Sequence, residues 1–195
     1  MKKIVLIDGH PDGESFCSVM AKEYCRDVQD CSNGCCSVDM IAVRDLRFDP
    51  ILHFGYRQKQ EIEEDLVRVQ KLITDCSHLV VIVPVWWGNF PALFKGFLDR
   101  CFVSGFSHRF DPIKKRPVKL LKGKTATIIY TQGSPWWYSR FFLADSFWKI
   151  AKRGVFSFAG FKPVKRKYYS TVKSGTDEER KRILGEVYQL GQRAF

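Results

Sequence analysis

Five short segments along the chain have sequences typical of β-strands, and one of them is continuously hydrophobic. Leu79 to Val83 form an uninterrupted apolar run that is rich in β-branched residues, and Pro84 ends it. A run without alternation indicates a strand that is buried on both faces of a sheet. The predicted strands cover residues 2–7, 37–43, 79–83, 124–130 and 163–170.

Between these segments the apolar residues recur at intervals of three and four, which predicts amphipathic helices. The predicted helices cover residues 16–26, 59–76, 92–102 and 138–153, and a last helix begins at Thr176 or Asp177. Residues 44–58, 104–122 and 156–161 are predicted as loops. Strands that alternate with helices predict one domain, residues 1–195, with a five-stranded parallel sheet between two layers of helices.

Two tryptophans follow the most buried strand directly. Trp86 and Trp87 lie between Pro84 and the helix that starts after Pro91. Ligands of open α/β sheets bind at the carboxyl ends of the strands, so two indoles there predict a wall for a flat molecule. The alternative is that the tryptophans only fill the core.

Two further loops follow strands and contain small and polar residues. Residues 8–15 (DGHPDGES) precede a helix, and Ser15 is a plausible N-cap beside amides that could bind a phosphate. The spacing matches neither GxGxxG nor a Walker motif. His10 has the alternative role of bonding a backbone carbonyl. Residues 131–135 (TQGSP) form the third loop, which we expect in the same crevice.

Composition and charge limit the metal sites, compartments and partners that the sequence is compatible with. The seven cysteines lack metal-ligand spacing, which predicts no metal site, free thiols and a cytoplasmic protein. No segment has the length of a membrane span. The net charge is +11, and the basic residues cluster within residues 114–124 and 162–167. Neither cluster contains a recognisable nucleic-acid-binding motif. We expect these charges to attract anionic ligands or to remain solvated, and we expect no nucleic acid and no membrane insertion.

These loops together fit a flavin. The first could bind its phosphate, the second its planar ring and the third its polar edge, while the redox chemistry belongs to the cofactor. The sequence contains no Ser-His-Asp set, HExxH motif or phosphate-binding Gly-Lys-Ser/Thr motif that would favour hydrolysis or phosphoryl transfer.

A set of motifs then carries a family resemblance. They are His10-Pro11 with Ser15-Phe16, Pro84-Val85-Trp86-Trp87 with Phe90-Pro91-Ala92, residues 93–100 (LFKGFLDR), and Thr131-Gln132-Gly133-Ser134. In this combination the chain resembles the NAD(P)H:quinone oxidoreductases of the flavodoxin-like superfold, including the bacterial modulators of drug activity. The resemblance covers nearly the whole chain. It implies a flavodoxin-like α/β/α sandwich, reduction of quinones by ping-pong hydride transfer, and a homodimer with two flavin sites.

The resemblance also assigns residues. It places His10, Ser15, Phe16 and Cys17 at the phosphate and ribityl chain, Pro84, Val85, Trp86 and Trp87 along the ring, and Thr131, Gln132, Gly133 and Ser134 at its polar edge. Phe106, His108, Phe110 and Phe158 match positions that cover the substrate pocket, partly from the second subunit. Tyr138 lies near the position of a tyrosine that, in members of this family, is proposed to assist charge relay. The cofactor is FAD or, as the alternative, FMN, with NAD(P)H as the electron donor.

The sequence departs from the family pattern at several places. Cys17 replaces a usual asparagine, Thr-Gln-Gly-Ser replaces Thr-Thr-Gly-Gly, and no histidine follows Tyr138 for a relay. These departures weaken the case for a protein acid or base but leave flavin stacking intact. Three alternatives stay open: a reductase of nitro or azo compounds, a flavodoxin-like regulatory or ancillary protein, and a nucleic-acid-binding protein.

Overall fold

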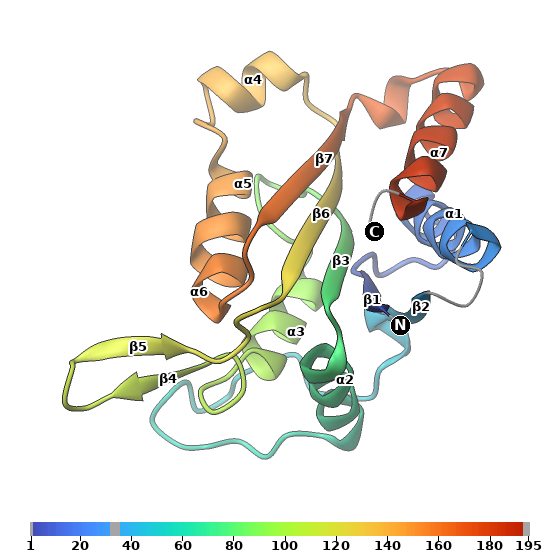
Figure 1. The fold of residues 1–195 in the computed structure, drawn as a ribbon. Coiled ribbons are helices and arrows are strands. Elements are labelled where there is room, and N and C mark those ends of the chain that lie inside the picture. The colour runs from blue at the N-terminus through green and yellow to red at the C-terminus, as the bar shows by residue number, and fades with distance from the viewer. Residues whose placement is uncertain (1, 32–35, 193–195) are drawn as a thin grey trace.

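A five-stranded sheet forms the centre of the computed structural model, which describes residues 2–31 and 36–192. The strand order is β2-β1-β3-β6-β7, and every neighbouring pair is parallel (Figure 1). The strands are β1 (Lys2–Asp8), β2 (Cys36–Ala42), β3 (His78–Pro84), β6 (Thr125–Gln132) and β7 (Val164–Ser170). The predicted five-stranded parallel sheet is therefore confirmed.

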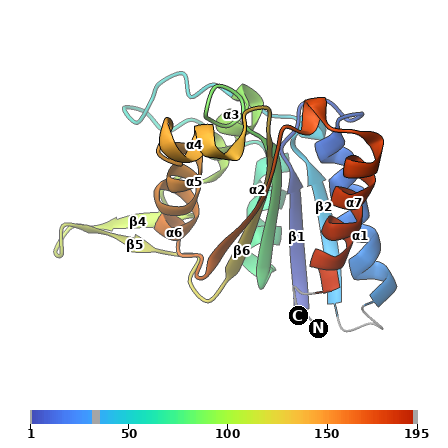
Figure 2. The same ribbon diagram turned by 90° about the horizontal axis from the view of Figure 1, so that it is seen from above.

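Helices cover both faces of this sheet, which confirms the three layers (Figures 1 and 2). On one face α1 (Phe16–Cys31) and α7 (Asp177–Gln192) pack on Ile4, Leu6 and Ile82. On the other face α2 (Glu64–Asp75) and α3 (Ala92–Cys101) pack on Val5, Ile7 and Val81. Alternate residues of β1 and β3 face opposite cores, and every residue of β3 is buried, as its unbroken apolar sequence predicts.

The predicted helix over residues 138–153 is wrong as one continuous element. The chain instead forms α4 (Trp136–Phe141), α5 (Ser146–Lys149), the π-helical segment η2 (Ile150–Phe156) and α6 (Ser157–Ala159). Ala144 and Asp145 adopt left-handed backbone angles, with φ of 49° and 56°, and break the helix. An ion pair across to β7 fixes this break, because Arg166 Nη1 lies 2.6 Å from Asp145 Oδ2. The same helical stretch replaces much of the loop predicted over residues 156–161.

The loop predicted over residues 104–122 contains an antiparallel hairpin. Its strands are β4 (His108–Asp111) and β5 (Arg116–Lys119), and it projects away from the sheet (Figures 1 and 2). Because β6 begins shortly after this hairpin, the hairpin lies near the amino end of the central sheet. No helix among the residues that the structure describes combines the length and the apolar character that crossing a bilayer requires.

The long segment between β2 and α2 is held by a buried arginine. It contains the short 3₁₀ helix η1 (Val43–Asp45), and a second one, η3 (Val172–Ser174), follows β7. Arg100 of α3 is 1% exposed. Its guanidinium donates to the carbonyls of Asp49 and Glu61 at 3.1 and 2.6 Å and to the carboxylate of Glu63 at 2.8 Å. This tertiary anchor is why a stretch without a clear sequence period still has a defined path.

Candidate functional site

Three loops meet at the carboxyl edge of the sheet, because β1, β3 and β6 are neighbours. The Gly9 N–H donates to the Ile82 carbonyl at 2.8 Å, which ties the first loop to β3. The Val85 N–H donates to the Thr131 carbonyl at 2.8 Å, which ties the second loop to the third. Cys17 Sγ lies 3.4 Å from Thr131 Oγ1, which links the start of α1, directly after the first loop, to the third loop. The three loops therefore form one continuous surface, as their positions in the sequence predict.

The first loop, residues 9–15, is organised by local hydrogen bonds. Ser15 Oγ accepts the Ser18 N–H at 3.2 Å, which confirms Ser15 as the N-cap of α1. The Asp12 N–H donates to His10 Nδ1 at 3.0 Å, so the neutral ring carries its proton on Nε2. Burial lowers the pKa of His10 below its usual range, although Asp8 and Asp12 oppose this shift. His10 is therefore a neutral donor near pH 7.

The start of α1 keeps two amides available. Within the part of the chain that the structure describes, the N–H groups of Phe16 and Cys17 have no hydrogen-bond acceptor. Both belong to the first turn of a helix of 16 residues, where the aligned peptide dipoles favour an anion. The Cys17 thiol itself stays protonated, because burial raises its pKa to about 12. A phosphate is the group that these amides fit.

The second loop contains a tight turn with an unusual residue in it. Trp86 and Asn89 exchange two backbone hydrogen bonds, at 3.0 and 2.9 Å. Between them Trp87 and Gly88 have φ angles of 51° and 71°, the pattern of a type I′ turn. The side chain of Trp87 is fully exposed, at 104%, and that of Trp86 is 45% exposed. The alternative in which both tryptophans fill the core is therefore wrong.

Trp86 lies next to the first loop. Its ring meets that of His10 edge to face, with 5.4 Å between the ring centroids. The turn is also well anchored at its base, because Phe90, which follows it, is buried against Phe94 and Phe147. A rigid strand and a buried aromatic cluster thus hold two exposed indoles, one of which contacts His10 of the first loop.

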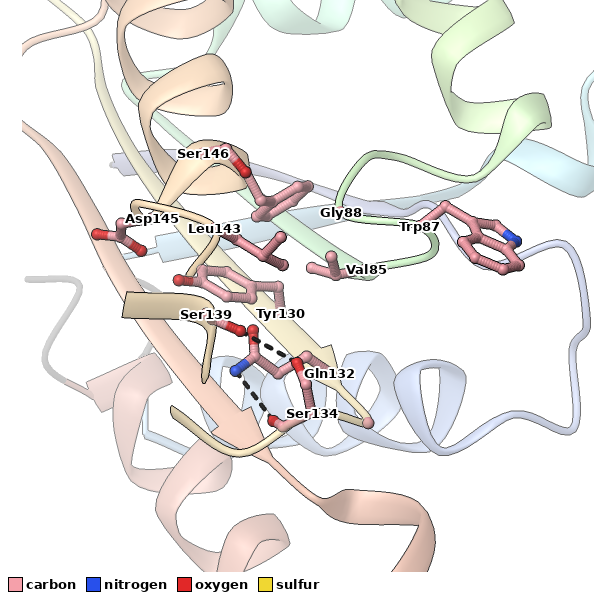
Figure 3. Close-up of a pocket in the computed structure, with 12 residues that line it drawn as sticks. Val85, Trp87, Gly88, Tyr130, Gln132, Ser134, Ser139, Leu143, Asp145 and Ser146 are labelled. Atoms are coloured by element: carbon pink, nitrogen blue, oxygen red, sulfur yellow. Dashed lines mark hydrogen bonds between the residues drawn. The ribbon is translucent and has the colours of Figure 1, made fainter. Parts of the chain in front are cut away.

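The third loop borders a cavity of about 210 Å³. Figure 3 shows polar side chains of β6 and the third loop on one side of it and the loop that contains Val85 and Gly88 on the other, with Trp87 at the rim. Gln132 Nε2 donates to the Ser134 carbonyl at 3.2 Å, and Ser134 Oγ lies 3.1 Å from Ser139 Oγ. The cavity can therefore offer amide and hydroxyl groups to the edge of a planar ligand.

Sequence reasoning missed several residues of this cavity. They are Tyr130, Ser139, Leu143, Asp145, Ser146 and Phe147. Burial raises the pKa of Tyr130 to about 12, so its hydroxyl stays protonated. Tyr130 could have been found as the last aromatic residue before the third loop. The remaining five fall inside the segment predicted as a continuous helix, where the sequence carries no signal for the break at Asp145.

Tyr138 does not line this cavity. It is 40% exposed on α4, and its ring stacks on Phe142 with 5.4 Å between the centroids. Its neighbour Ser139 faces the cavity instead. A role for Tyr138 in charge relay stays a prediction.

The residues predicted to cover a substrate pocket lie at the other end of the sheet. His108 and Phe158 contact each other, with 5.0 Å between ring centroids, and Phe106 packs on Phe102. Phe110 is exposed on the hairpin β4–β5. The hairpin and α6 both lie toward the amino end of β6, away from the three loops at its carboxyl end (Figure 1). The role of these four side chains in covering a substrate pocket stays a prediction.

These features can be set beside known proteins. The sequence profile of a family described as having the flavodoxin-like fold matches residues 2–191. The chain belongs to this flavodoxin-like family. A crystal structure of Smu.1420 from Streptococcus mutans UA159 has a TM-score of 0.84 and 28% identity to it, over 98% of this chain and 99% of the other.

Three relatives of this flavodoxin-like protein have names that describe redox enzymes. An uncharacterized NAD(P)H oxidoreductase of Haemophilus influenzae is 28% identical over 76% of this chain and 74% of the relative. The ribosyldihydronicotinamide dehydrogenase (quinone) of Mus musculus is 23% identical over 96% and 90%. The FMN-dependent NADH:quinone oxidoreductase 2 of Clostridium perfringens is 24% identical over 57% and 53%.

Proposed function

We propose that this protein is a flavin-dependent NAD(P)H oxidoreductase that reduces quinones by two-electron, ping-pong transfer. The observation that carries the proposal is an exposed indole, Trp87, held in a strained turn at the border of a polar cavity. A bulky residue with positive φ costs stability and is retained mainly at functional sites. The names of the relatives support the same reaction class.

The residues present fit a flavin. The amides of Phe16 and Cys17, with Ser15 beside them and the Nε2–H of His10, would bind the phosphate end. Trp86 and Trp87 with Pro84 and Val85 would contact the ring, and the segment Thr131–Gln132–Gly133–Ser134 would bond its polar edge. A bound flavin supplies the redox chemistry, accepting and giving two electrons. The chain contributes binding, orientation and exclusion of water.

We propose FMN rather than FAD as the cofactor. The Clostridium perfringens relative is FMN-dependent by name, which favours the alternative over FAD, the first expectation from the sequence. Mass spectrometry of the chromophore that denaturation releases tests this choice directly.

A homodimer is the assembly that we propose, with each site completed by the partner. No residue of α4 is buried, although it carries Trp136, Trp137, Tyr138 and Phe141. An exposed apolar patch of this kind marks an interaction site. α4 and the hairpin lie on the same side of the molecule, at opposite ends of the sheet (Figures 1 and 2). A two-fold axis would therefore bring the hairpin of one copy to α4 and the cavity of the other.

The compartment that we propose is the reducing cytoplasm. Five of the seven cysteines, Cys17, Cys25, Cys36, Cys76 and Cys101, are free thiols, and structural disulfides are typical of oxidising compartments instead.

The decisive experiment combines cofactor identification with turnover. The purified protein should bind FMN and oxidise NADH or NADPH when a quinone is added. An azo dye and a nitroaromatic compound, assayed in parallel, report the class of acceptor. A protein that is colourless, and that leaves the absorption and fluorescence of added FMN unchanged, would contradict the proposal. Sedimentation of wild type and of Trp137→Asp tests the dimer, since the charge should produce monomers.

A further inference from the structure

A buried carboxylate lies directly beneath the first loop. Asp8 ends β1, and its side chain is completely buried. Its Oδ1 accepts the His10 N–H at 3.1 Å, and its Oδ2 accepts the Ser18 hydroxyl at 2.6 Å. Burying an ionised carboxylate is costly unless a cation and hydrogen bonds compensate for it. The feature that compensates for this charge comes from another part of the chain.

That feature is the guanidinium of Arg44, in the short 3₁₀ helix η1 after β2. Arg44 Nη1 lies 2.6 Å from Asp8 Oδ2, 3.2 Å from the His10 carbonyl and 3.1 Å from Ser18 Oγ. The Ser18 hydroxyl in turn lies 3.1 Å from the Asp12 carbonyl. One side chain therefore contacts the end of β1, the start of the first loop and the first turn of α1.

The loop is shaped to accept this guanidinium. A Cβ atom added at Gly13 would lie only 3.1 Å from Arg44 Nε, closer than side chains normally approach. Glycine at this position lets the loop lie on the arginine. All three contacts are made by Nη1, which lies one covalent bond further from the backbone than the ammonium nitrogen of a lysine would.

We propose that Arg44 is a positioning residue, which holds residues 9–15 in the shape that binds the phosphate of the cofactor. This inference rests on the proposed flavin function. Arg44 acts through Asp8, the His10 carbonyl and Ser18. It also neutralises Asp8, whose negative charge would otherwise lie beneath the amides that bind an anion.

This role predicts an effect on one part of the ligand only. FMN and riboflavin share the ring and the ribityl chain and differ in the phosphate. In Arg44→Met the affinity for FMN should fall by about tenfold or more, the effect of losing charge-assisted hydrogen bonds and their geometry. The affinity for riboflavin should change by less than about twofold, because the ring contacts lie on the other two loops. Quenching of flavin fluorescence by the flavin-free protein measures both.

Two more variants separate positioning from charge. Arg44→Lys keeps the positive charge, but its side chain is one covalent bond shorter than the path to Nη1, so it should recover only part of the FMN affinity. Arg47→Met is the matched control, because it removes one charge from the same connection at an exposed side chain. It should bind FMN like wild type. Arg44→Lys also preserves the test if Arg44→Met fails to fold, and thermal unfolding of the flavin-free proteins identifies that case.

The possible outcomes are distinct. Equal losses for FMN and riboflavin in Arg44→Met, or full recovery of FMN affinity in Arg44→Lys, would overturn the positioning role while the flavin function stands. Unchanged FMN affinity in both variants would do the same. Wild-type protein that binds neither ligand would overturn both proposals. Selective loss of FMN affinity, with partial recovery by lysine, supports Arg44 as the residue that positions the phosphate loop.

Discussion

Replacing Trp87 by asparagine should stabilise the flavin-free protein and weaken flavin binding. Trp87 is fully exposed, so folding removes none of its apolar surface from water and its truncation forfeits no burial energy. Its φ of 51° is unfavourable for a bulky side chain. Asparagine tolerates this region, and Asn followed by glycine is the preferred pair in a type I′ turn. The two properties of this variant should therefore change in opposite directions.

The magnitudes follow from the turn and from the exposed ring. A non-glycine residue in left-handed backbone stores about 1–3 kcal/mol, and we expect asparagine to recover about 1 kcal/mol of it. For a chain of this length that raises Tm by about 2–4 °C. Loss of the indole removes a ring contact worth about 0.5–1.5 kcal/mol together with the apolar area that the ring covers. The affinity for FMN should fall by at least about tenfold.

Calorimetry of the flavin-free protein and titration with FMN measure the two effects. Tyr56→Asn is the matched control: Tyr56 is equally exposed, at 95%, but its φ is not positive. It should change neither Tm nor affinity. A fall of Tm in Trp87→Asn would show that the indole packs on the protein, and unchanged FMN affinity would remove Trp87 from the site.

Three further expectations concern other parts of the molecule. Arg100→Met leaves the Glu63 carboxylate and two carbonyls without their cation, and chemical denaturation should show a loss of about 3–5 kcal/mol. Burial lowers the pKa of His78 to about 4 from 6.5, so the unfolded state binds the proton first and stability falls as the pH drops below 6.5. Between pH 7 and pH 5 the free energy of unfolding, measured with urea, should fall by about 2 kcal/mol, and His78→Gln should abolish this pH dependence. Tyr138→Phe should keep quinone turnover within a few-fold of wild type, whereas loss of a catalytic acid would lower it about a hundredfold or more.

The sheet and its first three helices could be predicted because their signals are local. The unbroken run at Leu79–Val83 indicates a strand buried on both faces, and the helix of residues 92–101 follows a proline that marks its start. The carboxyl ends of adjacent parallel strands must share one edge, so the meeting of the three loops also follows from the sequence.

The remaining features depend on contacts between distant residues. The break at Asp145 is held by Arg166 on β7, and no pattern in the sequence predicts that these two residues pair. The buried pair of Asp8 and Arg44 joins residues 36 positions apart, so local patterns cannot reveal it. The exposure of Trp87 likewise depends on the turn type, which places a tryptophan where asparagine or glycine is usual.

Three energetically unfavourable features lie at the carboxyl edge of the sheet. They are the buried carboxylate of Asp8, the strained and exposed Trp87, and the unburied aromatic residues of α4. Sequences retain such features mainly where function compensates for them. A bound flavin would cover Trp87, and a partner subunit would cover α4, so binding would relieve two of the three. The buried carboxylate of Asp8 would remain buried in the complex, because the pair of Asp8 and Arg44 shapes the loop and does not contact the ligand. These three features identify the carboxyl edge of the sheet as the functional site independently of any relative.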